Sequence, residues 1–91
     1  MSVDFPNQSR SFDEVRDAVR FTGYDGMFEV RFFVEAQALA THAAGPDDPE
    51  AWETACLSAF DARRKSIYDA ARAVHARKRH DTHTLTADNL L

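Results

Sequence analysis

The chain has 91 residues, of which 44% are hydrophobic and 29% are charged, and its formal net charge at pH 7 is −4. This length fits one domain over residues 1–91, and the apolar fraction is high enough for a core, which excludes a disordered chain. The acidic balance argues against a dedicated binder of nucleic acid or of anionic membranes.

Membrane insertion and secretion have no support in the sequence. No apolar run approaches the roughly 20 residues that a spanning helix needs, and the first residues lack the pattern of a secretory signal. Cys56 is the single cysteine, so it has no partner for an internal disulfide. We therefore expect a cytoplasmic protein that does not bind membranes and in which Cys56 is a buried thiol.

The first residues alternate only briefly. Val3 and Phe5 have polar neighbours, which predicts a short edge strand ending at Pro6. Residues 7–11 are predicted to form a polar loop. Residues 11–14 (Ser-Phe-Asp-Glu) have the form of a capping box, which predicts a single helical turn at that point.

The clearest local pattern is a hairpin with strands at about 17–23 and 27–34, where apolar and polar side chains alternate. One face of the second strand carries four apolar residues: Phe28, Val30, Phe32 and Val34. Gly23 and Gly26 flank Tyr24-Asp25, which is turn chemistry for a short loop. Phe33 breaks the polar face, and we interpret it either as cover for a sheet edge or as part of an interaction surface.

Helical spacing follows the hairpin. Apolar residues predict a short helix at about 35–43, and Gly45 suits its C-cap. The stretch at about 49–78 has no Gly, and no Pro after Pro49, so it predicts a long helix. A continuous helix of this length spans on the order of 45 Å, more than a small domain covers. Either the helix breaks, with Ser58 as a restart, or one end packs on a second copy; we favour the continuous helix.

Arg63 interrupts the apolar stripe of the long helix between Phe60 and Ile67. In one interpretation the guanidinium pairs with a carboxylate of the sheet, such as Asp17 or Glu29, or marks a recognition point on a partner. In the other, the stem packs on the core while the guanidinium reaches water. We favour the packed stem, an arrangement that Arg adopts readily.

The last predicted element is a strand at about 82–86, where three threonines give β propensity. The elements together predict the α+β class: a small antiparallel sheet with a central hairpin, a short helix, a long helix and this C-terminal strand.

Several stretches occur in a recognisable order and spacing: 5–11, the hairpin from 19 to 35, 59–61, 67–72 and 85–88. In these stretches the chain resembles an uncharacterised bacterial family, domain of unknown function 1488. The resemblance implies a small bacterial α+β protein with no established activity, and it brings no functional residues. The chain departs from the pattern at Asn89-Leu90, where an aromatic residue is expected, and in the basic stretch 63–65.

Four basic residues crowd the C-terminal turns of the long helix: Arg72, Arg77, Lys78 and Arg79. They have the chemistry to contact phosphates, but cations at this end also complement the helix dipole, and no aromatic residue is interleaved to stack on bases. Three histidines near this helix end are candidate metal ligands: His75, His80 and His83. Surface histidines are common at a helix end, however, and we expect no metal and no cofactor.

No catalytic motif stands out, so we expect no enzyme. The leading hypothesis is a non-enzymatic interaction module that self-associates, as a dimer, through the long helix or the exposed sheet, with Phe33 and Arg63 as candidate surface residues. The alternative is a weak nucleic-acid or regulatory binder that uses the C-terminal basic residues. A small enzyme or metal protein is the third hypothesis, and it requires a pocket containing His75 and His83.

Overall fold

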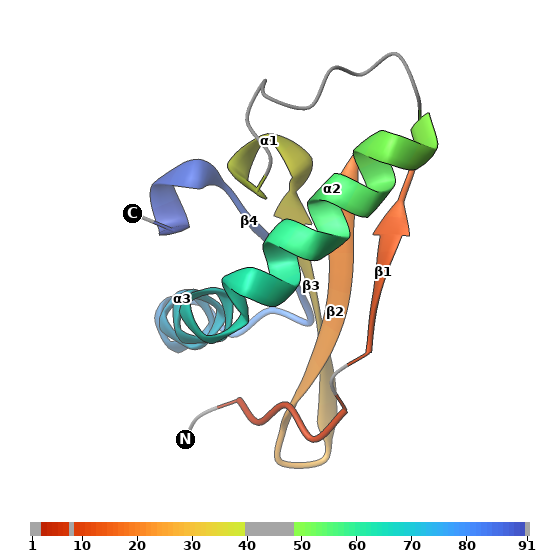
Figure 1. Ribbon diagram of the computed structural model, residues 1–91. Helices are drawn as coiled ribbons and strands as arrows, with labels where there is room; N and C mark the ends of the chain where they lie inside the picture. The colour runs from red at the N-terminus through yellow and green to blue at the C-terminus, as the bar shows by residue number, and fades with distance from the viewer. Residues whose placement is uncertain (1–2, 8, 40–48, 91) are drawn as a thin grey trace.

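The computed structural model describes residues 3–7, 9–39 and 49–90. Four strands form one sheet in the order β1-β2-β3-β4, and helices cover one of its faces (Figure 1). The elements in chain order are β1 (Arg10–Asp13), β2 (Ala18–Asp25), β3 (Phe28–Glu35), α1 (Ala36–Leu39), α2 (Pro49–Ala62), α3 (Arg64–Arg77), β4 (Thr82–Leu85) and the 3-10 helix η1 (Ala87–Leu90). The α+β class and its central hairpin are confirmed.

The sheet is mixed rather than antiparallel. β1, β2 and β3 pair antiparallel, whereas β4 lies parallel to β3, with His83 beside Phe32. Parallel neighbours need a long crossover connection, and here α2 and α3 lie on that connection. The predicted C-terminal strand is confirmed, ending one residue earlier than expected.

The hairpin loop is tighter than the sequence indicates. Asp25 pairs with Phe28, so the loop consists of Gly26 and Met27, and Tyr24 and Asp25 belong to β2. Gly26 has a φ of 64°, and a two-residue loop with positive φ at its first position favours glycine there. This geometry places Asp25 on a strand, where its side chain has a fixed face.

The predictions of a short edge strand near Val3 and Phe5, a loop at 7–11 and a helical turn at 11–14 are wrong. Asp4 makes a single bridge to Tyr24 instead of a strand, while the segment predicted as loop and helical turn forms β1. The Asp13 carboxylate accepts N–H bonds from Val15 and Arg16, at 3.0 and 3.1 Å, and so closes the turn after β1. Pairing with β2 supplies the backbone partners that no local pattern announces.

The predicted continuous helix at about 49–78 is wrong, because Arg63 separates α2 from α3 with φ −113° and ψ 19°. Phe60 and Ile67, on either side of this break, are both fully buried. The change of direction brings both apolar faces onto one sheet, and the radius of gyration is 12.8 Å. Burial of both halves therefore outweighs the uninterrupted helix that local propensity favours.

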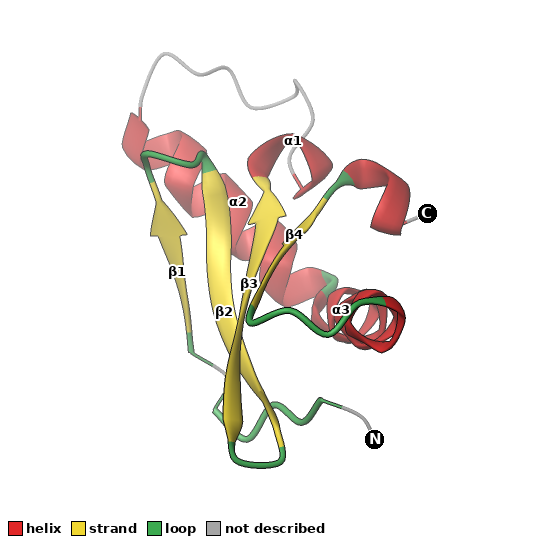
Figure 2. Cartoon of the chain, turned by 180° about the vertical axis from the view of Figure 1, so that it is seen from behind, coloured by secondary structure: helices red, strands yellow, loops and turns green. Residues whose placement is uncertain are grey.

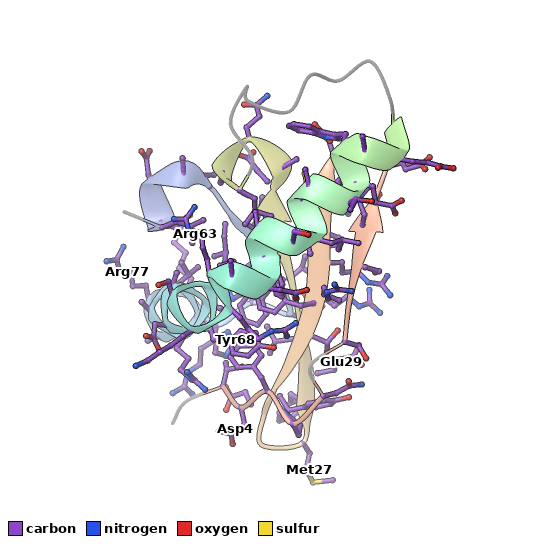
Figure 3. All side chains as sticks on the ribbon, viewed as in Figure 1. Asp4, Met27, Glu29, Arg63, Tyr68 and Arg77 are labelled. Carbon is purple, nitrogen blue, oxygen red and sulfur yellow. The ribbon has the colours of Figure 1, made fainter. Side chains whose placement is uncertain are left out.

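Arg63 itself lies at the surface in the corner between the helices (Figure 3). Its Nη1 donates to the carbonyl of Ala38 at 3.1 Å. The carboxylates proposed as its partners bind other groups: Asp17 accepts from Trp52, and Glu29 lies 3.5 Å from Arg31. The side chain thus joins the corner to α1.

The core lies between the sheet and the helices. It includes residues from every layer: Val19, Phe21, Phe32, Val34, Leu85, Cys56, Phe60, Ile67 and Ala71. No described helix covers the opposite face (Figure 2). Phe33 points to that side yet is only 5% exposed, and the Arg16 guanidinium lies 4.2 Å from the centre of its ring.

The short helix predicted at about 35–43 is confirmed over Ala36–Leu39 as α1, and residues 40–43 lie outside the described part of the chain. Within the described residues, none of the helices is both long enough and apolar enough to cross a membrane.

Candidate functional site

Three polar side chains from three elements meet on the helix-covered side of the sheet. Strand alternation puts Asp25 on the same face as Phe21, and His83 on the same face as Leu85. His75 reaches them from the last turns of α3. Its Nε2 lies 2.9 Å from Oδ2 of Asp25, and its Nδ1 lies 3.0 Å from Nε2 of His83. The result is a chain of two hydrogen bonds, Asp25–His75–His83.

Both histidines are buried, with His75 4% and His83 6% exposed. The His83 ring also stacks on Phe32, with 5.4 Å between ring centres. Buried polar groups are costly unless they are hydrogen-bonded, and this chain provides partners for both nitrogens of His75. The pair is therefore held in place by packing as well as by polar contacts.

The electrostatics of the chain favour a charged Asp25 carboxylate and a neutral His83 ring. The pKa of Asp25 is lowered, chiefly by its hydrogen bond to His75, and further by the charges of His75 and Arg79. The pKa of His83 is lowered, first by burial and then by the charges of His75 and His80, against an opposing effect of Asp81.

A groove of about 830 Å³ lies beside this chain. Residues 25–30 of the hairpin tip form one wall, and His75 with residues 79–81 forms the other. Met27 and Phe28 are 95% and 78% exposed, and Met27 points away from the body of the molecule at the tip (Figure 3). Exposed apolar side chains beside a concave surface are typical of a docking site.

The groove also exposes part of a sheet edge. β3 begins at Phe28, but β4 accompanies it only from Arg31, whose N–H donates to the Asp81 carbonyl at 2.8 Å. Backbone groups alternate sides along a strand, so those of Glu29 face the same side as those of Arg31, where β4 has not yet begun. An open edge of this kind accepts backbone hydrogen bonds from a partner.

The structure divides the predicted basic cluster. The Arg72 guanidinium donates to the Val3 carbonyl at 3.0 Å and lies 5.1 Å from the centre of the Phe5 ring, so it holds the N-terminal segment against α3. All three basic residues at 77–79 are exposed. Arg77 lies at the end of that helix (Figure 3), and Arg79 lines the groove. Arg72 thus makes a structural contact, whereas Arg79 borders the groove.

The prediction that Cys56 is a buried thiol is confirmed. It is fully buried, and burial raises the pKa of its thiol to about 11, so the thiolate is scarce at neutral pH. As for metals, the described residues contain no group of three or more His, Cys, Asp or Glu side chains placed to hold an ion. The facing nitrogens of His75 and His83 bond each other instead.

Sequence reasoning named His75 and His83 but missed Asp25 as their partner. The signal was present: Asp25 keeps the alternation of Val19 and Phe21, so extending the strand by two residues predicts it on the inner face. The sequence did not indicate Met27 and Phe28 as a surface, because Phe28 lies on the apolar face of its strand. Phe28 is exposed because the helices end before they reach the hairpin tip (Figure 1).

Fold and groove together define a small α+β domain with a groove beside a carboxylate–histidine–histidine chain whose two rings are buried. Residues 3–85 match the family described as "Protein of unknown function (DUF1488)", so the chain belongs to that family. No curated protein and no solved structure matches the chain.

Proposed function

We propose that this protein is a small non-enzymatic interaction module that forms a homodimer through the groove at its hairpin tip. The observation that carries the proposal is the exposure of Met27 and Phe28, 95% and 78%, at the wall of the groove of about 830 Å³. Apolar side chains of this size gain most when a partner removes them from water.

The groove has the self-complementarity that a two-fold dimer needs. In such a dimer the same surface meets itself, so it must contain both a projecting part and a hollow. The hairpin tip projects and the groove beside it is hollow. Its charges are mixed as well, with Glu29 and Asp81 acidic and Arg79 and His80 basic, so opposite charges can face each other across the axis.

The helices do not support self-association. The break at Arg63 divides the long helix that the sequence predicts, so neither half is too long for the domain. Phe33, the other candidate surface residue, is covered by Arg16. The tip groove supports the same function through different residues.

Sedimentation equilibrium tests the proposal by comparing the native chain with Phe28→Ser and Met27→Ser. We expect a native dimer and a dissociation constant raised roughly a hundredfold or more in Phe28→Ser, because the substitution removes one Phe from each subunit and burying each contributes about 1.5–3 kcal/mol. Val15→Ser is the matched control, since Val15 is 96% exposed but does not line the groove. A native chain that stays monomeric at high concentration, or a dimer that tolerates Phe28→Ser, would contradict the proposal.

Nucleic-acid binding by the C-terminal basic residues has less support. Arg72 is engaged with the N-terminal segment, and Arg79 lies in the groove with the carboxylates of Asp25 and Asp81. Binding to DNA or RNA that falls steeply with salt and is lost in a triple Ala variant at 77–79 would favour this function over the dimer.

A further inference from the structure

We propose that the Asp25–His75–His83 chain is a proton switch that holds the docking groove at neutral pH and releases it in acid. This inference concerns the regulation of the surface assigned above and rests on the proposed function. The chain joins three elements around the groove, since Asp25 belongs to β2, His75 to α3 and His83 to β4.

The two hydrogen bonds that link Asp25, His75 and His83 are satisfied when both rings are neutral. The Asp25 carboxylate only accepts, so Nε2–H of His75 donates to it. Nδ1 of His75 then accepts from Nε2–H of His83, 3.0 Å away. One added proton preserves both bonds, because the hydrogen between the rings can sit on either nitrogen while the carboxylate balances the charge.

A second added proton is incompatible with this arrangement. Both rings are then imidazolium, and an N–H on His75 points at an N–H on His83 across 3.0 Å. The rings are 4% and 6% exposed, so water does not screen the repulsion or replace the lost bond without movement. The bond between the rings must therefore break.

The charges that face the pair add to this effect in acid. Arg79 and His80 are the basic side chains nearby, and the ring centre of His80 lies 5.9 Å from that of His83. Asp25 from β2, Glu29 from β3 and Asp81 before β4 oppose them. Acid thus changes the local balance from compensated to positive.

Breaking the bond between the rings separates α3 from β4 and loosens residues 79–81 between them, which form one wall of the groove. The Asp25–His75 bond persists, because a protonated His75 still donates to the carboxylate, and it keeps His75 beside the hairpin tip. Once His75 and His83 separate, residues 79–81 no longer keep their place opposite the hairpin tip, and a second copy docked in the groove loses its complementary surface. We expect the dimer to weaken as the pair gains its second proton.

Imidazole ¹⁵N spectra recorded across a pH titration test the switch directly. We expect His75 and His83 to titrate as one coupled pair, with amide shifts of Gly26 and Met27 following the same midpoint. His83→Gln keeps a side-chain donor but cannot titrate, so it should abolish the pH response of the tip amides. His80→Gln is the control, because it changes the exposed neighbour and should leave the response of the tip amides in place. Independent titration of the two rings, or a tip that does not respond, overturns the switch.

Asp25→Asn provides a second variant should His83→Gln fail to fold. It keeps an oxygen acceptor for His75 and removes the compensating charge, so the coupled titration should move to lower pH. An unchanged midpoint counts against the switch.

Sedimentation separates the switch from the proposed dimer. Between about pH 7.5 and a pH below the folded pKa of His83, which lies under its ordinary value of 6.5, the dissociation constant of the native chain should rise by about tenfold or more, since a change of one pKa unit in one group corresponds to a tenfold change. His83→Gln should lose this dependence, and a native dimer that is equally strong at both pH values overturns the switch. A native monomer at both pH values defeats the proposed function alone, because the ¹⁵N titration still decides whether the proton switch exists.

Discussion

The indole Nε1 of Trp52 in α2 donates a hydrogen bond of 2.9 Å to the carboxylate of Asp17, 35 residues earlier in the chain. Asp17 precedes β2 with a φ of 51°, in the left-handed region, and its carbonyl accepts the N–H of Ala36 at 2.9 Å. One residue therefore ties the start of β2 to both α1 and α2.

Replacing Asp17 by Ala should lower the free energy of unfolding by about 1–3 kcal/mol, since it adds strain in the left-handed region and removes the partner of the indole. Asp17→Asn is the control: asparagine tolerates the same backbone and keeps an acceptor oxygen, so its cost should be small. Urea unfolding followed by the fluorescence of Trp52, the single tryptophan, measures both. Equal losses in the two variants would show that the negative charge, rather than the backbone or the acceptor, matters.

The two glycines of the hairpin should respond differently to alanine. A Cβ at Gly23 would lie 2.4 Å from Val3 Cγ1 and 2.7 Å from Phe5 Cε1, whereas a Cβ at Gly26 meets nothing within 4 Å. Because the Phe5 ring stacks on Tyr68 at 4.0 Å, making room at Gly23 disturbs the packing of the N-terminal segment.

We expect Gly23→Ala to lower the free energy of unfolding by about 1–3 kcal/mol through overpacking. Gly26→Ala should cost roughly 1 kcal/mol through its positive φ alone, and Gly26→Asn should recover most of that loss. Denaturant titrations of the three variants make the comparison. A Gly23→Ala protein of native stability would mean that the N-terminal segment does not pack on the hairpin in this way.

The sequence predicts the parts of the fold in which a local pattern and its burial agree. Alternation over residues 28–34 places Phe32 and Val34 inside, and the structure confirms both. The break at Arg63 could not be predicted, because neither Gly nor Pro marks it. It follows from the tertiary requirement that Phe60 and Ile67 cover the same sheet.

The candidate site was only half predictable for a similar reason. The sequence spacing brings His75 and His83 near a helix end, but it does not say that they bond each other. Asp25 lies 50 residues before His75, and only the register of β2 places its carboxylate beside that ring. The groove depends on where β4 begins relative to β3, which no local pattern encodes.

Cys56 should be inert toward alkylation in the native state. Its thiol is fully buried and its pKa is raised to about 11, so the thiolate at pH 8 is about a hundredfold scarcer than for a thiol with the ordinary value of 9.0. We expect iodoacetamide to modify Cys56 at least a hundredfold more slowly in the folded chain than in guanidinium chloride. Labelling at the same rate in both conditions would place the thiol at the surface. Adding Asp17→Ala gives a further check, since the Asp17 charge contributes to the raised pKa.

The stability of the fold should depend on pH through His83 and Asp25. The pKa of His83 is lowered from 6.5, so the unfolded chain takes up its proton before the folded chain does. The stability that neutral His83 contributes is therefore present above about pH 6.5 and is lost as the pH falls toward its folded pKa. The pKa of Asp25 is lowered from 3.8, and its contribution is present above that value and lost in stronger acid.

Both effects have the same sign, so the free energy of unfolding should decrease in two stages on acidification, first below about pH 6.5 and again below about pH 4. Urea titrations at a series of pH values, at protein concentrations where no dimer forms, measure the slope. His83→Gln should flatten the first stage, since glutamine does not titrate, while Asp25→Asn should reduce the second. His80→Gln should leave the first stage in place, because His80 is exposed. A first stage that persists in His83→Gln but vanishes in His80→Gln would assign the acid response to the surface histidine and leave the buried pair as a packing contact.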